Sequence, residues 1–151
     1  MSSESFVVLD ESYLPQMGEL FKNAFAGEPW YDDWSDPVQL GEYIREISGS
    51  YNALNFGLVS DGKLIAMSVG MIRHWWEGTN YNIEELCVAP GYQHQGLGGR
   101  FMSMIEQEVK DRGYCGIFLQ TDNDKPAYEF YHKHGFKDLG SHVSLYKRVK
   151  D

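Results

Sequence analysis

The order of apolar and polar residues divides the chain into extended and helical segments. Short apolar or alternating runs predict strands, at 6–9, 54–60, 63–74, 81–88 and 116–121. Apolar residues spaced three and four positions apart predict helices, at 12–26, 37–47, 97–112 and 126–134. Residues 136–139 and 142–149 are predicted to form a closing pair of strands. The resulting order, β-α-α-β-β-β-α-β-α-β-β, predicts an α/β fold (α+β in three layers).

The segment between the first two predicted helices has no regular period. Residues 28–34 read Glu-Pro-Trp-Tyr-Asp-Asp-Trp, which is both aromatic and acidic, and we predict a loop there. No linker, internal repeat or low-complexity tract interrupts the chain. We therefore expect a single domain over residues 1–151.

Net charge narrows the range of partners. Thirteen lysines and arginines against 22 aspartates and glutamates give a net charge of −9. Nucleic-acid-binding domains present basic faces, so we expect neither DNA or RNA nor an anionic membrane as a partner. A cationic ligand suits this charge, although acidity can also serve solubility alone.

The cysteines and the apolar runs bear on location. Cys87 and Cys115 have neither metal-ligand nor disulfide-framework spacing, and we interpret both as reduced, structural residues. The first residues lack a basic segment followed by an apolar one, and no run of about 18 apolar residues occurs. We therefore expect no signal peptide, no membrane span and a cytoplasmic location.

The most informative stretch joins a predicted strand to a predicted helix. Residues 88–100 read Val-Ala-Pro-Gly-Tyr-Gln-His-Gln-Gly-Leu-Gly-Gly-Arg. Backbone N–H groups at a helix start bind anions, and glycine lets phosphate oxygens approach them closely. The stretch therefore indicates a site for a phosphate-bearing ligand, although a plain close-packed turn would also need glycine. It is not a Walker loop, because no Gly-Lys-Ser/Thr follows.

Two blocks of the sequence resemble the GNAT acetyltransferases. Gln93-x-x-Gly96-x-Gly98 is similar to that family's R/Q-x-x-G-x-G/A motif, which holds the pyrophosphate of coenzyme A. Residues 124–136, Asp-x-x-Ala-x-x-Phe-Tyr-x-Lys-x-Gly-Phe, resemble the family's block N-x-x-A-x-x-F/L-Y-x-K-x-G-F. Asp124 stands where the family usually has asparagine, so we carry over no role to it.

The resemblance implies a mixed, mostly antiparallel sheet that splays apart between its fourth and fifth strands, with helices on both faces. It implies acetyl-CoA, held in that splay, as the cofactor, and no metal. The implied cofactor-binding residues lie on the fourth strand and in the glycine-rich turn: Leu86, Cys87, Val88, Gln93, His94, Gln95, Gly96, Leu97, Gly98, Gly99 and Arg100.

Acetyl transfer to an amine needs a base, because most primary amines are protonated at pH 7. Glu84 and Glu85 precede the cofactor segment of the fourth strand, and strand alternation places them on opposite faces. The alternation does not choose between them, but Glu84 matches an acidic position of aminoglycoside 6′-N-acetyltransferases, and we take it as the expected base. Tyr131 matches the family's tyrosine that protonates the leaving thiolate, with Tyr128 as the second candidate.

Aromatic faces and carboxylates gather at the expected acceptor site, a combination that suits a polycationic amine. Three features together resemble aminoglycoside 6′-N-acetyltransferases. They are Trp-Trp-Glu at 75–77, the strand-four acid Glu84 and Gln-Thr-Asp at 120–122. The expected substrate-binding residues are Trp30, Asp32, Asp33, Trp34, Trp76, Glu85 and Asp122.

We thus expect acetyl transfer to a cationic small molecule, with an aminoglycoside 6′-amine as the first choice. A polyamine or other small amine, and a protein N-terminus or lysine, remain open as acceptors. A function of another class, an acyl-CoA-binding sensor without catalysis, also remains open. Relatives are commonly homodimers, so a homodimer is a further possibility.

Overall fold

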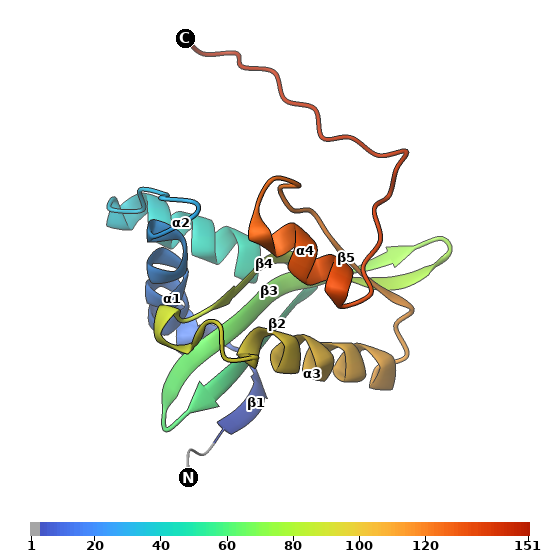
Figure 1. Ribbon diagram of the computed structural model, residues 1–151, viewed down its shortest axis with the longest axis horizontal. Helices are drawn as coiled ribbons and strands as arrows, with labels where there is room; N and C mark the ends of the chain where they lie inside the picture. The colour runs from blue at the N-terminus through green and yellow to red at the C-terminus, as the bar shows by residue number, and fades with distance from the viewer. Residues whose placement is uncertain (1–3) are drawn as a thin grey trace. The chain divides into compact units, whose positions relative to one another are not determined.

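The computed structural model of the protein describes residues 4–151, which fall into two compact units, one up to Gln120 and one from Thr121 onward. The prediction of a single domain over residues 1–151 stays a prediction. The first unit contains a five-stranded sheet in the order β1-β2-β3-β4-β5 (Figure 1). Its strands are β1 (Glu4–Val8), β2 (Ala53–Ser60), β3 (Lys63–Trp75), β4 (Gly78–Val88) and β5 (Gly116–Leu119).

Strand pairing confirms the expected mixed sheet. The pairs from β1 to β4 are antiparallel, whereas β4 and β5 run parallel. β4 pairs with β5 only from Asn80 to Ile83, although β4 itself continues to Val88. β5 itself ends at Leu119, opposite Ile83, so this edge of β4 has no β5 partner from Glu84 to Val88, as the predicted splay requires.

Helices cover both faces of this sheet (Figure 1). On one face lie α1 (Leu14–Ala26) and α2 (Pro37–Ser48), whose buried side chains join one apolar cluster with Met67, Val69 and Cys87 of the sheet. On the other face lies α3 (Leu97–Asp111), whose buried Phe101 packs against Phe6 of β1.

Local sequence explains where these helices begin. Asp36 caps α2, because its side chain accepts hydrogen bonds from the backbone N–H groups of Val38 and Gln39, and Pro37 occupies the first turn. Asp10 caps the short 3-10 turn η1 (Glu11–Tyr13) that leads into α1. A second turn, η2 (Pro90–Tyr92), precedes α3. Residues 28–34 contain no helix or strand, as predicted.

The second unit contains α4 (Pro126–Lys133). The predicted strands at 136–139 and 142–149 are wrong, because the structure of residues 4–151 has no strand in either segment. An alternating pattern reports a preference for a half-buried pleated surface, but a strand also needs a neighbour for its backbone hydrogen bonds. The side chains that made the pattern are exposed: Val143, Leu145, Tyr146 and Val149.

The two cysteines differ from each other. Cys87 is buried on β4, and burial raises the pKa of its thiol. Cys115 is exposed and precedes β5, so the expectation of a structural strand residue is wrong for it. Both are free thiols.

Candidate active site

The glycine-rich turn ends in an uncapped helix N-terminus. Gly96 is the N-cap of α3 with φ +77°, and no side chain caps the helix there. His94 also has a positive φ, of 61°. The first N–H groups of α3 therefore have no intrahelical acceptor, and the helix dipole adds positive potential at the same place. This geometry is favourable for an anion, and the phosphate site predicted at this turn stays a prediction.

Two predicted cofactor-binding residues shape the turn itself. The Gln93 side-chain amide donates a hydrogen bond to the carbonyl of Val88 at 3.1 Å. The Gln95 amide donates one to the carbonyl of Gly91 at 3.2 Å. The first contact ties the turn to the end of β4, and the second ties it to η2.

Arg100 already has a partner within the first unit. Its Nη2 contacts the two carboxylate oxygens of Glu4 at 2.8 and 2.7 Å, and both side chains are partly exposed. The resemblance placed the backbone amide of Arg100, not its guanidinium, near the pyrophosphate. In the structure that amide donates a hydrogen bond to the carbonyl of Gly96 at 3.1 Å.

The splayed part of β4 offers the second half of a cofactor site. Within the described residues, no strand pairs with the β5-facing edge of β4 after Ile83, so Leu86, Cys87 and Val88 present an open edge there. An extended ligand with amide groups can pair with such an edge in the manner of an added strand. An anion site beside an open strand edge fits the pyrophosphate and the amide-containing arm of coenzyme A.

The two glutamates of β4 differ because a bulge separates them. Val69 of β3 pairs with Glu85 and Gly70 pairs with Ile83, so the ladder skips Glu84. Such a bulge reverses the alternation of side chains along the strand. Glu85 therefore shares the face of its partner Val69, toward α1 and α2, and Glu84 is exposed.

Glu85 occupies an unusual environment for a carboxyl group. It accepts a hydrogen bond from the Tyr43 hydroxyl of α2 at 2.9 Å. The pKa of Glu85 is raised to about 7, mainly by burial; the Tyr43 hydrogen bond lowers it, and the nearby charges of Glu84 and Asp32 contribute to the rise. A carboxyl group with a pKa near neutral pH is typical of an active site.

Tyr43 connects Glu85 to the loop before α2. Its ring stacks on the indole of Trp34, with centroids 5.2 Å apart, and lies 5.5 Å from the ring of Phe21. Burial is the main cause that raises the pKa of Tyr43, so its hydroxyl keeps its proton at neutral pH. The loop residue Trp34 therefore lies one side chain away from Glu85.

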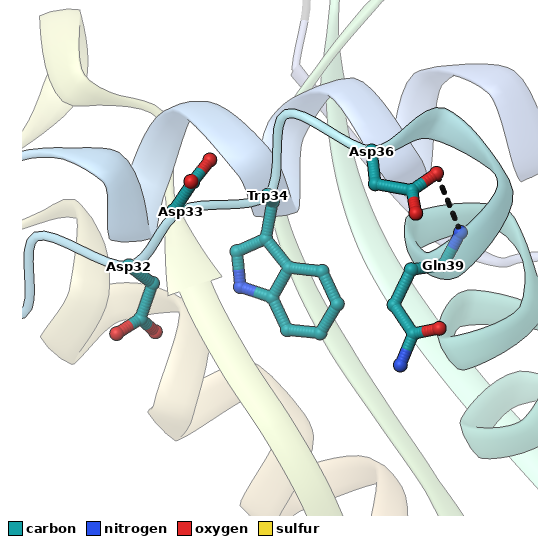
Figure 2. Close-up of a pocket in the computed structure, with 5 residues that line it drawn as sticks. All are labelled: Asp32, Asp33, Trp34, Asp36 and Gln39. Atoms are coloured by element: carbon teal, nitrogen blue, oxygen red, sulfur yellow. Dashed lines mark hydrogen bonds between the residues drawn. The ribbon is translucent and has the colours of Figure 1, made fainter.

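A pocket of about 450 Å³ opens beside Trp34 (Figure 2). Figure 2 shows Asp32 and Gln39 pointing to the same side as the indole, and Asp33 pointing away. Asp33 accepts a hydrogen bond from the backbone N–H of Ser35 at 3.0 Å, and side-chain bonding to Ser35 lowers its pKa. The Trp34 Nε1 is buried and meets no hydrogen-bond acceptor among the described residues, which is uncommon for a buried donor. The lining residues are Asp32, Asp33, Trp34, Asp36 and Gln39.

Not every predicted acceptor residue lies at this pocket. Trp30 packs its ring edge-on against Phe25, with centroids 4.9 Å apart. Trp76 lies in the turn between β3 and β4 and is 82% exposed, at the end of the hairpin that projects away from α1 and α2 (Figure 1). The structure thus brings Asp32, Asp33 and Trp34 together but not Trp76.

The remaining predicted residues belong to the second unit. Asp122 is exposed after β5. Tyr131 lies on α4, and its ring contacts those of Phe130 and Phe136, with centroids 5.4 Å away in each case. The roles of both residues remain predictions.

Sequence reasoning missed Tyr43. It belongs to the apolar stripe of α2, which includes Leu40, Ile44 and Ile47 at helical spacing. A tyrosine in such a stripe usually packs as a core residue, and Tyr43 does so through its ring. A weak signal was available. A buried phenol needs a hydrogen-bond partner, and the predicted sheet offers one pair of adjacent carboxyl groups as acceptors, Glu84 and Glu85.

The chain belongs to the acetyltransferase (GNAT) family, whose profile matches residues 14–136. It is therefore a GNAT acetyltransferase with acetyl-CoA as its cofactor, as the turn and the open strand edge indicated. In the part of the chain that the structure describes, no helix is long and apolar enough to span a membrane.

Two curated relatives illustrate the range of the family. An acetyltransferase of Agrobacterium fabrum is 28% identical over 107 residues, which cover 65% of this chain and 76% of that protein. The alanine N-acetyltransferase of ribosomal protein bS18 from Escherichia coli is 31% identical over 86 residues, which cover 56% of this chain and 55% of that enzyme.

Solved structures share the fold at low sequence identity. A possible acetyltransferase from Clostridium difficile superposes with a TM-score of 0.80 at 14% identity, covering 97% of this chain and 99% of the other. An aminoglycoside acetyltransferase from a soil metagenomic sample, in complex with sisomicin, has a TM-score of 0.72 at 20% identity and 97% coverage of both chains. The aminoglycoside N-acetyltransferase AAC(6')-Iy in complex with CoA has a TM-score of 0.71 at 17% identity, covering 99% of this chain and 97% of the other.

Proposed function

We propose that this enzyme acetylates a primary amine of a small molecule that carries several ammonium groups. The observation that supports this acceptor is the pocket lined by Asp32, Asp33 and Asp36, which lies one aromatic side chain away from Glu85. Carboxylates bind ammonium groups through charge-assisted hydrogen bonds, and the face of Trp34 attracts a cation. A second ammonium group of the acceptor would bind in the pocket while the first lies at Glu85.

The turn at residues 93–100 and the open edge at residues 86–88 are the proposed cofactor-binding elements. When bound, acetyl-CoA supplies the acetyl group as a thioester. The proton acceptor is one of the two β4 glutamates, of which the sequence favours Glu84. Tyr131 remains the proposed proton donor.

An aminoglycoside 6′-amine is the particular acceptor that we propose first. Aminoglycosides carry several ammonium groups on a rigid sugar frame, which the acidic pocket suits, and two of the structural neighbours are aminoglycoside acetyltransferases. The bS18 enzyme gives a reason to test one other class, a peptide N-terminus. A peptide has few positive charges, so the acidic pocket favours the small polycation.

The test is a measurement of CoA thiol release over a panel of amines. Neomycin, which has a 6′-amine, is compared with paromomycin, which has a hydroxyl at that position, together with spermidine and an Ala-initiated peptide. We expect release with neomycin and a much slower reaction with paromomycin. Equal release from both would reject the 6′-amine, and release only with the peptide would reject the polycation.

The pocket is tested by an Asp32→Asn variant. We expect the KM of the polycationic acceptor to rise several-fold with little change in the KM of acetyl-CoA, because one exposed ion pair contributes up to about 1 kcal/mol. Glu106→Asn is the control for loss of charge, since Glu106 is exposed on the opposite side of the sheet, on α3. An unchanged acceptor KM in Asp32→Asn would remove Asp32 from the acceptor site.

A further inference from the structure

We infer that Glu85 is the residue that takes the proton from the acceptor amine, and that Tyr43 is a positioning residue that holds Glu85 for this step. This inference rests on the proposed function, because it concerns the same acceptor site. It differs from the sequence-based expectation, which favoured Glu84. It also gives a role to a helix residue that no sequence motif marked.

The first argument is the direction in which the two glutamates lie. The bulge in β4 leaves Glu84 without a partner residue on β3, and Glu84 is exposed. Glu85 pairs with Val69, whose side chain belongs to the cluster under α1 and α2. The acidic pocket belongs to the loop that joins these helices, so Glu85 lies on the face of the sheet from which the acceptor approaches.

The second argument is the contact between Glu85 and Tyr43. The Tyr43 hydroxyl donates to Glu85 Oε1 at 2.9 Å, which occupies one carboxylate oxygen and leaves the other for an amine. The stack on Trp34 and the contact with Phe21 hold the Tyr43 ring in place. A carboxylate held by such a contact loses little rotational freedom when the acceptor binds.

The third argument is that the surrounding charges suit proton transfer near neutral pH. The groups that act on Glu85 are Tyr43 from α2, Asp32 from the loop and Glu84 on its own strand. Glu46 of α2 and Cys87 of β4 belong to the same electrostatic cluster through Tyr43 and Glu85. Burial raises the pKa of Glu85 to about 7, which is favourable for a general base.

The proton balance is simple. The bound ammonium group would give one proton to the Glu85 carboxylate, and the freed nitrogen lone pair would form the C–N bond to the acetyl carbon as the C–S bond of the thioester breaks. The second proton lost from the nitrogen would end on the sulfur of the leaving thiol. Glu85 returns this proton to water after the product leaves. Tyr43 keeps its own proton throughout, because burial raises its pKa.

Replacement of Tyr43 by phenylalanine tests the positioning role. Phe keeps the ring packing but removes the donor, and that hydrogen bond lowers the pKa of Glu85. In Tyr43→Phe we expect the acidic limb of the pH profile of kcat/KM to move up by about one pH unit, on the scale of a hydrogen bond to a charged group. At pH values below this limb, kcat/KM of Tyr43→Phe is then about tenfold lower than that of the unmodified enzyme, and raising the pH restores it. Tyr51→Phe is the matched control, because Tyr51 is fully exposed.

A titration of the protein without substrates provides a second readout. Carboxyl NMR signals of glutamate, with Glu85 assigned through Glu85→Gln, should show Glu85 titrating near pH 7 and at a higher pH in Tyr43→Phe. Equal midpoints in the two proteins, or an acidic limb that does not move, would overturn the role of Tyr43.

The choice of glutamate is tested by Glu85→Gln and Glu84→Gln. We expect Glu85→Gln to lower kcat/KM by about 100-fold or more, the usual contribution of a general base. The loss in Glu84→Gln should be at least ten times smaller. The reverse order would overturn the assignment of Glu85. If no amine of the panel is acetylated, the proposed function fails and the proton-acceptor role fails with it. The titration would then still decide whether Tyr43 controls Glu85.

Discussion

At the scale of single residues, the pKa of Glu85 links the candidate site to stability. The pKa of this carboxyl is raised from 4.5 to about 7 in the folded protein. Because the folded protein holds the proton more tightly than the unfolded chain, the stabilisation by protonated Glu85 is complete below pH 4.5. It is lost as the pH rises toward 7.

Glu85→Gln should therefore stabilise the protein at pH 8 and leave its stability nearly unchanged at pH 4. The neutral amide avoids the burial of a charge, and we expect a gain of up to about 3 kcal/mol in the free energy of unfolding at pH 8. Urea denaturation at the two pH values measures this gain. A loss of stability of similar size at both pH values would contradict it.

Tyr131 carries a separate prediction at the same scale. If its phenol protonates the leaving thiolate, Tyr131→Phe should lower kcat about tenfold or more while the KM of acetyl-CoA changes little. Steady-state kinetics over a range of pH values measure both constants, and Tyr128→Phe tests the second candidate in parallel. A kcat that stays the same across the pH range would remove the role from Tyr131.

At the scale of elements, the N-terminus of α3 depends on one backbone conformation. Gly96 has φ +77°, which a residue with a Cβ adopts at a cost of about 1–2 kcal/mol. Gly91 has no positive φ, and a Cβ at either glycine would meet no atom within 4 Å. An alanine has room at both positions but is strained only at position 96. A comparison of the two alanine variants therefore tests the effect of the backbone conformation alone.

Gly96→Ala should weaken CoA binding about tenfold, because the strain displaces the N–H groups that we propose as phosphate ligands, whereas Gly91→Ala should bind CoA normally. Isothermal titration calorimetry of both variants with CoA measures the difference. Equal affinities would show that the turn does not need the left-handed conformation.

The bulge of β4 has a wider effect than its single extra residue suggests. It places Tyr81 and Ile83 on the face of α3, and Glu85 and Cys87 on the face of α1 and α2. One strand therefore contributes to both apolar layers and also directs the Glu85 carboxyl group toward Tyr43 of α2. Gly70 lies opposite the bulge, where a Cβ would collide with the carbonyl oxygen of Asn82.

At the scale of the whole molecule, the net charge of −9 favours the approach of a cation. We expect the KM of a polycationic acceptor to rise several-fold between 50 mM and 500 mM salt, because exposed charges are screened over about a Debye length. The KM of a monoamine should change much less. Steady-state kinetics at several salt concentrations test this, and an equal salt dependence for both acceptors would contradict an electrostatic acceptor site.

Much of the architecture was predictable from local pattern. Helix caps, apolar spacing and glycine positions placed four helices and five strands close to their observed positions, since these signals act within a few residues. The closing strands were not predictable in the same way. A strand depends on a neighbour for its hydrogen bonds, and alternation at 142–149 reports nothing about that neighbour.

The sequence by itself determined the family, the glycine-rich turn before α3 and the presence of an acidic aromatic loop, because each depends on residues that are close together in the chain. Only the tertiary structure decided which glutamate lies on the face of α1 and α2 and contacts Tyr43. That choice depends on a bulge in the pairing of β4 with β3, and on Tyr43, which lies 42 positions before Glu85 in the chain. A one-residue change in register reverses every following side chain, and strand alternation alone contains no sign of such a change.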